Sequence, residues 1–229
     1  MLKFVLLALT TAALASPALA HPVSSPGSWS FTLGGATDNR SKDASKTRGD
    51  PFVHGEVKWL SPDGLFYGGA GVETIESNGS DVEYQLNLGV RPTLAGVDLD
   101  LNIAHKWQAD ANPGADNKTL ELTASVSRSI GPASARLLLQ HSPEGAGATR
   151  AWTWVEARLG WDLAPNLSAS TAVGRREQSA NIDYTGWNAG VTYAVNDRLD
   201  LDLRWHDTDA LAQGPQYAGA LVAGLNVEF

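Results

Sequence analysis

The residues best able to do chemistry in this chain are its five histidines and its acids, because the sequence has no cysteine. His206 is followed by Asp207 and Asp209, a combination that offers half of an acid–base site at the rim of a fold. Acidic residues where a loop begins are usually solvated, or they bind a divalent cation. We therefore expect no catalytic residue here and a protein that is not an enzyme.

Two other histidines invite a chemical interpretation. His54 and Glu56 lie two residues apart on one expected strand, but no third ligand can be placed, so the sequence predicts no metal site. We expect His54 to be a polar residue on an inner face, and we expect no cofactor. His105 falls on an apolar face, where a lipase-like site would need a nearby serine. Its expected neighbours are Leu120 and Leu122, so we assign His105 to an interfacial belt.

The first twenty residues have the layout of a secretory signal peptide. Lys3 gives a positive start, Phe4 to Leu14 an apolar core, and Ala18 to Ala20 a small-x-small cleavage site. The apolar run is too short for a membrane-spanning helix, which needs about 20 apolar residues. We predict a signal peptide at 1–20 and a mature domain at 21–229 that is exported.

The charge balance excludes one class of partner. The formal net charge is −8, and loss of Lys3 with the signal peptide makes the mature chain more acidic. Nucleic-acid binding calls for a basic surface, so we expect no nucleic acid as a partner. The mature length is compatible with a single domain.

The elements that position these residues are strands, because apolar and polar residues alternate with a period of two through most of the chain. The clearest case is Tyr217 to Phe229, which ends on an aromatic carboxy terminus. That ending resembles the closing strand of outer-membrane barrels, where it serves as an assembly signal. Twelve segments alternate in this way: 28–36, 52–60, 65–75, 82–90, 97–107, 120–127, 133–140, 151–163, 167–174, 187–195, 199–206 and 217–229.

Connections between these segments alternate between long polar loops and short turns. Loops are expected at 37–50, 76–80, 108–117, 142–149, 175–183 and 207–215, and a tight turn at 61–64 contains Pro and Gly. This pattern predicts an all-β fold, a transmembrane antiparallel up-and-down β-barrel of about 12 strands with both ends in the periplasm. The alternative is a soluble β-sandwich or lipocalin-like barrel whose apolar face lies inside.

Aromatic residues on the apolar face support the membrane alternative. They fall into two girdles, as interfacial Trp and Tyr do in membrane proteins. The girdle beside the short turns is Trp59, Phe66, Trp161, Tyr193 and Phe229. The girdle beside the long loops is Tyr84, Trp107, Trp187, Trp205 and Tyr217.

Two segments resemble a known family. Thr37 to Arg40 with Ser45, then Gly49-Asp50-Pro51, His54-Gly55 and the run 61–69 resemble the start of the TorF family of porin-like proteins. The run 204–209 resembles that family's final Asp-Thr-Asp loop entry. In the first loop, Asn39 replaces the family's usual Tyr and Asp43 its usual Gly. The resemblance implies an outer-membrane channel.

The polar face of the expected barrel carries charges on nearly every strand. Twelve residues are predicted to line the interior: Glu56, Lys58, Glu73, Glu83, Asp100, Lys106, Glu121, Arg136, Glu156, Arg158, Asp202 and Arg204. They either line a narrow aqueous pore or form a salt-bridged plug. We favour the pore, because twelve strands enclose more space than the roughly eight whose interior side chains can fill.

The sequence therefore predicts a porin-like channel of the bacterial outer membrane for passive diffusion of small polar solutes or ions. The alternatives are a non-conducting structural or surface-interaction barrel and, less favoured, a hydrolase. Expected partners are outer-membrane lipids and lipopolysaccharide, the solutes, and the barrel-assembly machinery, which would recognise the last strand through Phe229. An acidic excess in the loops is expected to favour cation entry.

Overall fold

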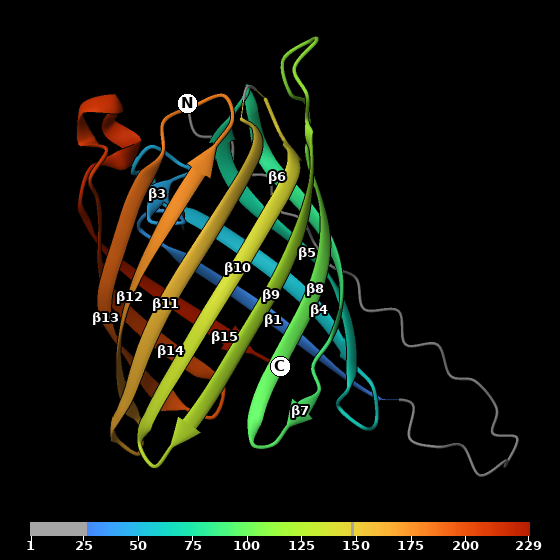
Figure 1. Ribbon diagram of the computed structural model, residues 1–229, viewed down its shortest axis with the longest axis vertical. Coiled ribbons are helices and arrows are strands. Elements are labelled where there is room, and N and C mark those ends of the chain that lie inside the picture. Colours follow the sequence, from blue (N-terminus) through green and yellow to red (C-terminus); the bar gives the residue numbers. More distant parts are fainter. Residues whose placement is uncertain (1–26, 148) are drawn as a thin grey trace, which may run out of the picture.

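The computed structural model describes residues 27–147 and 149–229, and its twelve long strands form a closed antiparallel barrel (Figure 1). Signal-peptide residues 1–20 lie outside this part, so cleavage stays a prediction. The barrel strands are β1 (Ser28–Ala36), β4 (Phe52–Leu60), β5 (Phe66–Ser77), β6 (Ser80–Val90), β8 (Val97–Gln108), β9 (Lys118–Ile130), β10 (Ala133–Gly145), β11 (Arg150–Ala164), β12 (Leu167–Gln178), β13 (Tyr184–Asn196), β14 (Leu199–Thr208) and β15 (Ala220–Glu228).

Three short strands and two 3-10 turns complete the described part. They are β2 (Arg40–Ser41), β3 (Ala44–Ser45), β7 (Thr93–Leu94), η1 (Leu211–Gln213) and η2 (Pro215–Tyr217). Within the described ranges, no helix is long and apolar enough to cross a membrane.

The barrel closes where the first and last strands pair. β1 pairs with β15 on one side and with β4 on the other, while β6 pairs with β8 to complete the ring. Phe31 N donates to Phe229 O at 3.2 Å, and Phe229 N donates to Phe31 O at 2.9 Å. Closure leaves no unpaired edge strand among the twelve described barrel strands, which is the condition for a sheet to span a bilayer.

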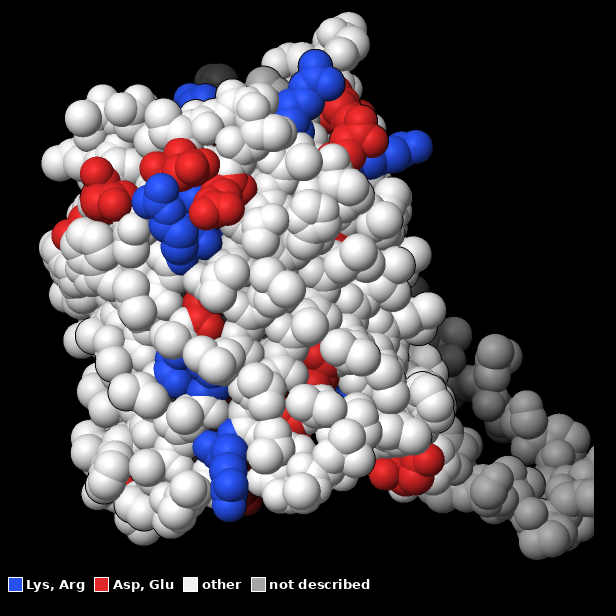
Figure 2. Space-filling model, in the orientation of Figure 1, with Lys and Arg blue, Asp and Glu red and all other residues white. Residues whose placement is uncertain are grey.

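The two faces of the wall differ as the alternation predicts. Outward side chains are large, apolar and exposed; Leu86, Leu88 and Leu137 are 52%, 67% and 58% exposed. Figure 2 shows one side, where Lys, Arg, Asp and Glu gather toward the two ends and most of the surface between them is uncharged. Such an apolar exterior is costly in water and suits lipid. The fold is therefore a transmembrane β-barrel, and the soluble alternative is excluded.

Aromatic residues of the expected girdles lie on this exterior, with one exception. Trp161 and Phe229, beside the short turns, are 53% and 61% exposed, and Trp205, beside the long loops, is 46% exposed. The prediction for Tyr217 is wrong, because this side chain is 7% exposed and lies inside. The alternating pattern continues through Tyr217, but η2 turns the chain there and β15 begins only at Ala220.

Two connections also differ from expectation. The predicted loop at 76–80 is a tight turn at Asn78 and Gly79, because β5 runs to Ser77 and β6 starts at Ser80. Both turn residues have positive φ, 53° for Asn78 and 80° for Gly79, as a two-residue hairpin requires. The connection between the expected segments 82–90 and 97–107 contains the two-residue strand β7, which the sequence pattern did not predict.

Candidate functional site

The first loop does not extend into solvent but folds into the barrel as a small hairpin, which we call the inner hairpin (residues 38–47, with β2 and β3). Its tip is a two-residue turn in which Lys42 and Asp43 have φ of 54° and 64°. This left-handed backbone normally selects glycine or asparagine and costs other residues about 1–2 kcal/mol each. The TorF motif has glycine at the position of Asp43, and glycine adopts this backbone conformation without strain. Asp43 does not, so it needs compensating contacts.

Those contacts come from the wall at β13 and β14. Asn188 Nδ2 donates to Asp43 Oδ1 at 2.8 Å, and His206 Nδ1 lies 2.8 Å from the same oxygen. The Tyr184 hydroxyl donates to the Lys42 carbonyl at 2.9 Å. Asp43 is only 3% exposed, so its carboxylate would carry a large desolvation cost without these partners.

The other side of the hairpin is held by the wall at β5 and β6. Lys46 Nζ donates to Glu73 Oε1 and, at 2.9 Å, to Glu83 Oε1. Asn39 Nδ2 donates to Glu73 Oε2 at 3.1 Å. β5 and β6 lie across the barrel from β13 and β14, so the hairpin crosses the lumen between two walls.

A group of charges at the level of the hairpin joins the loop to the wall; we call it the upper charged cluster (Lys42, Lys46, Lys106, Glu73, Glu83 and Glu121). Lys106 Nζ lies 3.2 Å from Glu121 Oε2 and 3.9 Å from Glu83 Oε1. Lys42 Nζ lies 4.0 Å from Glu121 Oε1, which is beyond hydrogen-bonding distance. Burial lowers the pKa of Lys42 to about 7, against the opposing attraction of Glu121.

The hairpin is also braced internally. Asp38, 4% exposed, pairs with Arg40 and accepts hydrogen bonds from Ser45 Oγ at 2.6 Å and Thr47 Oγ1 at 3.0 Å. Arg40 Nη1 donates to the Ala218 carbonyl at 2.8 Å, which ties the hairpin to the last loop. These bonds make the hairpin a fixed part of the lumen.

Two cavities lie on either side of the hairpin. The upper cavity, of about 320 Å³, opens among the long loops and is lined by Lys42, Trp152, Arg176, Gln178 and others. The lower cavity, of about 250 Å³, faces the wall at His54, Glu56 and Gln85. Four residues line both: Ser41, Lys46, Glu83 and Lys106. The upper charged cluster therefore forms the boundary between the two cavities.

Toward the short turns, the lumen holds smaller groups of charges and no part of the inner hairpin. Arg136 Nη2 and Arg158 Nε lie 2.9 Å and 3.2 Å from Glu156 Oε1. Separately, the Tyr67 hydroxyl donates to Asp100 Oδ1 at 2.6 Å. Arg136 is 39% and Arg158 30% exposed in the side chain, against 20% for Lys46 and 18% for Lys106 in the upper cluster, whereas Glu156 is 10% exposed.

The twelve predicted lining residues all lie on the inward face, but the structure divides them. Glu73, Glu83, Lys106 and Glu121 join the upper charged cluster, and Arg136, Glu156 and Arg158 form the group on β10 and β11. Asp202 and Arg204 pair at 3.2 Å. Asp100 bonds to Tyr67, Lys58 Nζ lies 5.4 Å from the Tyr67 ring, and Glu56 lines the lower cavity. A conducting role for this set stays a prediction.

The three histidines weighed as candidates for chemistry have structural partners. His206 binds Asp43, whereas Asp207 and Asp209 accept backbone N–H groups of Thr208 and Thr185, each at 2.8 Å. His54 Nε2 lies 3.0 Å from Asn226 Oδ1. His105 stacks against Trp107 with ring centres 5.9 Å apart on the exterior. Among the described residues, no three His, Cys, Asp or Glu side chains are grouped to hold a metal ion.

Comparison with known proteins decides the family. A family model described as a bacterial protein of unknown function, Gcw_chp, matches residues 20–223. The chain belongs to the Gcw_chp family. The motif resemblance to the TorF proteins is compatible with this membership. No protein with a curated description matches the sequence of this Gcw_chp protein.

Solved structures share the fold of this Gcw_chp protein at very low identity. The KdgM porin is 6% identical with a TM-score of 0.62, over 87% of this chain and 99% of that one. The NanC porin is 6% identical with a TM-score of 0.60, over 87% and 98%. An outer membrane channel from Pseudomonas putida F1 is 8% identical with a TM-score of 0.54, over 90% and 96%. At these identities the likeness establishes the barrel fold.

Several site residues of the Gcw_chp protein could not be recognised from the sequence pattern. Lys42, Asp43 and Lys46 have the character of ordinary polar loop residues, and Asn188 that of a common inward position. Arg176 was expected in the loop at 175–183, but β12 extends to Gln178 and includes it. The one sequence signal for this site is Asp43, which replaces the glycine usual in the TorF motif. A charged residue at a left-handed backbone position needs nearby partners, so this replacement indicates contacts with other parts of the chain.

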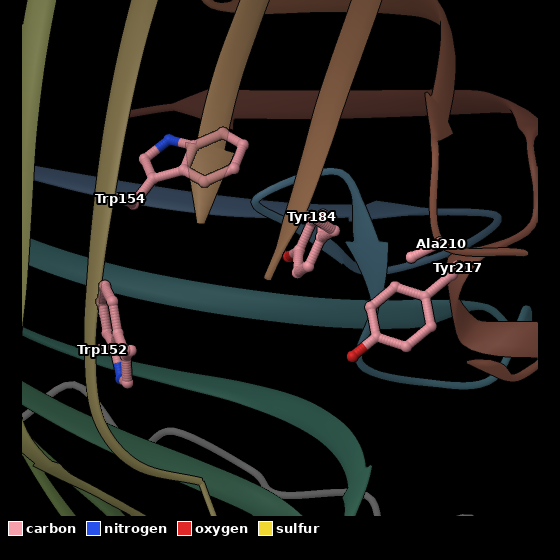
Figure 3. Close-up of a cluster of buried hydrophobic side chains, with 5 residues drawn as sticks. All are labelled: Trp152, Trp154, Tyr184, Ala210 and Tyr217. Atoms are coloured by element: carbon pink, nitrogen blue, oxygen red, sulfur yellow. The ribbon is translucent and has the colours of Figure 1, made fainter. Parts of the chain in front are cut away.

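Inside the barrel, an aromatic cluster packs beside the hairpin: Trp152, Trp154, Tyr184, Ala210 and Tyr217 (Figure 3). Tyr184 and Tyr217 meet edge to face with ring centres 5.1 Å apart, and Ala44 of the hairpin packs on the cluster. Gly174 leaves the space that the Trp154 ring fills, since a Cβ there would lie 2.1 Å from Trp154 Cζ2. This cluster backs one wall of the upper cavity and fixes the hairpin's apolar side.

Proposed function

We propose that the protein is a channel of the bacterial outer membrane through which small polar solutes and ions diffuse passively. The single observation that carries the proposal is the inner hairpin, which crosses the lumen between two walls and leaves a polar cavity on each side. A loop fixed inside a barrel narrows the pore and brings charged side chains close to the passing solute. The fold shared with the KdgM and NanC porins supports the same function.

The setting of the channel follows from its surfaces. The apolar exterior with aromatic residues near both ends is suited to outer-membrane lipids, with lipopolysaccharide around the acidic long loops. The terminal Phe229, hydrogen-bonded to β1, supplies the ending that the barrel-assembly machinery would recognise. Export through the signal peptide at 1–20 and a mature domain at 21–229 complete this proposal.

The direct test is single-channel recording of the refolded mature protein, residues 21–229, in a planar lipid bilayer at several salt compositions. We expect discrete, reproducible current steps with a measurable ion preference. Absence of current from protein shown to be folded would overturn the channel proposal. A non-conducting barrel that acts through its surface would then be favoured, in line with the density of ion pairs in the upper charged cluster.

A hydrolase is the weaker alternative. The Asp43–His206 pair resembles the carboxylate–histidine part of an acid–base site, but Asp43 also binds Asn188 and holds the hairpin tip. We therefore assign His206 a positioning role. Hydrolysis of a peptide or ester substrate by the wild type that His206→Ala abolishes while the barrel stays folded would contradict this assignment.

A further inference from the structure

The upper cavity contains two cations that no acid neutralises by a hydrogen bond among the described residues, and both lie against one indole ring. Lys42 Nζ lies 4.1 Å from the centre of the Trp152 ring, and Arg176 Cζ lies 4.9 Å from it. Arg176 Nε is buried and has no hydrogen-bond partner within the described part of the chain. The side chain of Lys42 is 8% exposed and its Nζ is 4.0 Å from Glu121. Two cations that share one small space repel each other unless an anion joins them.

The acids around this cavity are already engaged elsewhere. Glu121 binds Lys106 at 3.2 Å and accepts from Gln140 Nε2 at 2.9 Å. Glu83 binds Lys46 at 2.9 Å. Glu76, at the edge of the cavity, pairs with Arg48 at 2.7 Å. Each of these carboxylates thus has a nearer basic partner than Lys42 or Arg176, and the local excess of charge is positive.

We propose that the upper cavity binds a small oxyanion between Lys42 and Arg176, with Trp152 as the wall behind them. A guanidinium group offers parallel N–H donors that match two oxygens of a carboxylate, sulfate or phosphate, and an ammonium group adds a point charge. The cavity of about 320 Å³ opens among the long loops, so the ion enters from that side. This proposal deepens the channel function and rests on it for its biological meaning, because the site lies on the path that a solute takes to the hairpin.

Binding of the oxyanion has a specific consequence for the hairpin. Lys42 is one of the two residues of the hairpin tip, and its carbonyl accepts from Tyr184. An anion that pairs with its ammonium group relieves the desolvation of that group and stabilises the inward position of the tip. The passing anion is therefore held at the constriction by a residue of the constriction itself.

The test is isothermal titration of the refolded mature protein in detergent with sodium sulfate, whose charge does not change near neutral pH. We expect saturable binding, and we expect Arg176→Gln to weaken it by about tenfold or more, which corresponds to about 1.4 kcal/mol. Arg175→Gln is the matched control, because the neighbouring Arg175 side chain is 49% exposed and pairs at 3.8 Å with Asp183. It should bind sulfate as the wild type does.

Lys42→Gln provides a second variant, in the inner hairpin and not in a strand of the wall. It should also weaken sulfate binding. Sodium phosphate and sodium succinate in the same titration identify which oxyanion the site prefers, and choline chloride should give no heat of binding. No saturable binding of any of the three anions, or equal affinities in the Arg176→Gln and Arg175→Gln variants, would overturn the proposal.

The titration does not depend on conduction, so the two proposals fail separately. Folded protein that binds sulfate but passes no current would contradict the channel and leave the site intact. Current steps from protein that binds no oxyanion would leave the channel intact and contradict the site.

Discussion

The two halves of the lumen are built from the same residue types but in different ways. In the upper charged cluster, the inner hairpin supplies Lys42 and Lys46, and the wall supplies Lys106 and the three acids. The side chains of Glu83 and Glu121 are only 9% and 8% exposed. Toward the short turns, Glu156 is similarly buried at 10% exposed, but its partners Arg136 and Arg158 are 39% and 30% exposed, against 20% for Lys46 and 18% for Lys106 in the upper cluster. The difference shows that a loop folded into a charged lumen adds basic partners to the acids of the wall and shields the basic side chains there from water.

This contrast has an energetic side. Buried ion pairs must offset a desolvation cost, so each depends on keeping all of its partners. Pairs that remain in contact with water contribute about 0–1 kcal/mol and are replaced at little cost. Changes near the hairpin should therefore affect folding and conduction together, whereas changes near the short turns should affect the permeating ions alone.

The largest effect is expected from removal of the hairpin. Replacing residues 38–47 by ten alternating Gly and Ser residues deletes Lys42, Asp43 and Lys46 and lets the loop leave the lumen. We expect a severalfold rise in single-channel conductance, because the lumen loses its crossing segment. The matching replacement in the loop 109–117, which lies at the rim, should leave conductance nearly unchanged. A similar rise in both variants would remove the distinction between the two halves.

Charge reversal of an inward-facing arginine should change selectivity with little change in conductance. Arg158→Glu and Arg204→Glu each place an acid on the inward face, so the preference for cations should rise in reversal-potential measurements. Leu86→Ala and Leu122→Ala, on the exterior, should lower stability and leave selectivity as in the wild type. Equal selectivity in all four variants would show that the lumen charges are not on the conduction path.

A smaller effect is expected from a single methyl group at the hairpin contact. In Gly186→Ala, the new Cβ would lie 2.7 Å from Asp43 Oδ2 and 2.8 Å from Asp43 Cβ, so Asp43 must move away from Asn188 and His206. We expect a loss of about 1–3 kcal/mol in the free energy of unfolding, because a buried carboxylate loses partners, together with flickering of the open-channel current.

The matched control for this variant is Gly71→Ala, where the nearest atom to the new Cβ, Gly55 O, would be 3.6 Å away. This alanine also faces the lumen but fits without displacement. Quiet current and unchanged stability in the Gly186→Ala variant would contradict the anchoring role of Asp43.

The smallest effect concerns pH. Since burial lowers the pKa of Lys42 to about 7, the residue loses its charge as the pH rises from about 6 to about 8. The upper lumen then becomes more negative, so cation preference should rise across this window. Reversal potentials of wild type and Lys42→Gln measure the change, and the variant should show a much smaller pH dependence. A pH step that persists in Lys42→Gln would assign it to another group.

The same pKa shift affects stability with a definite sign. The unfolded lysine has a pKa near 10.5, so between a pH of about 7 and 10.5 the unfolded chain binds more protons at this residue than the folded one does. The contribution of Lys42 to stability therefore rises with pH in that window. The Lys42→Gln variant should lose this slope in denaturation measured at several pH values.

The wall of the barrel can be predicted from the amino-acid sequence alone. Alternation of apolar and polar residues is a local property of each strand, so it is enough to assign Leu86, Leu88 and their counterparts to the exterior, and Glu83, Lys106 and Glu121 to the interior. The strand number followed from the count of alternating segments, and the antiparallel barrel from the connections between them. An apolar face on every strand must be covered by lipid or by a second sheet.

The arrangement of residues inside the wall, by contrast, depends on tertiary contacts. The inner hairpin has the composition of a solvent-exposed loop, and its position depends on partners far away in the sequence, such as Asn188 and His206 for Asp43. The same is true of Tyr217, whose alternation predicts an outward side chain but whose ring packs on Tyr184 inside. Local periodicity carries no information on such contacts, because they exist only after the barrel closes and brings opposite strands within reach of one loop.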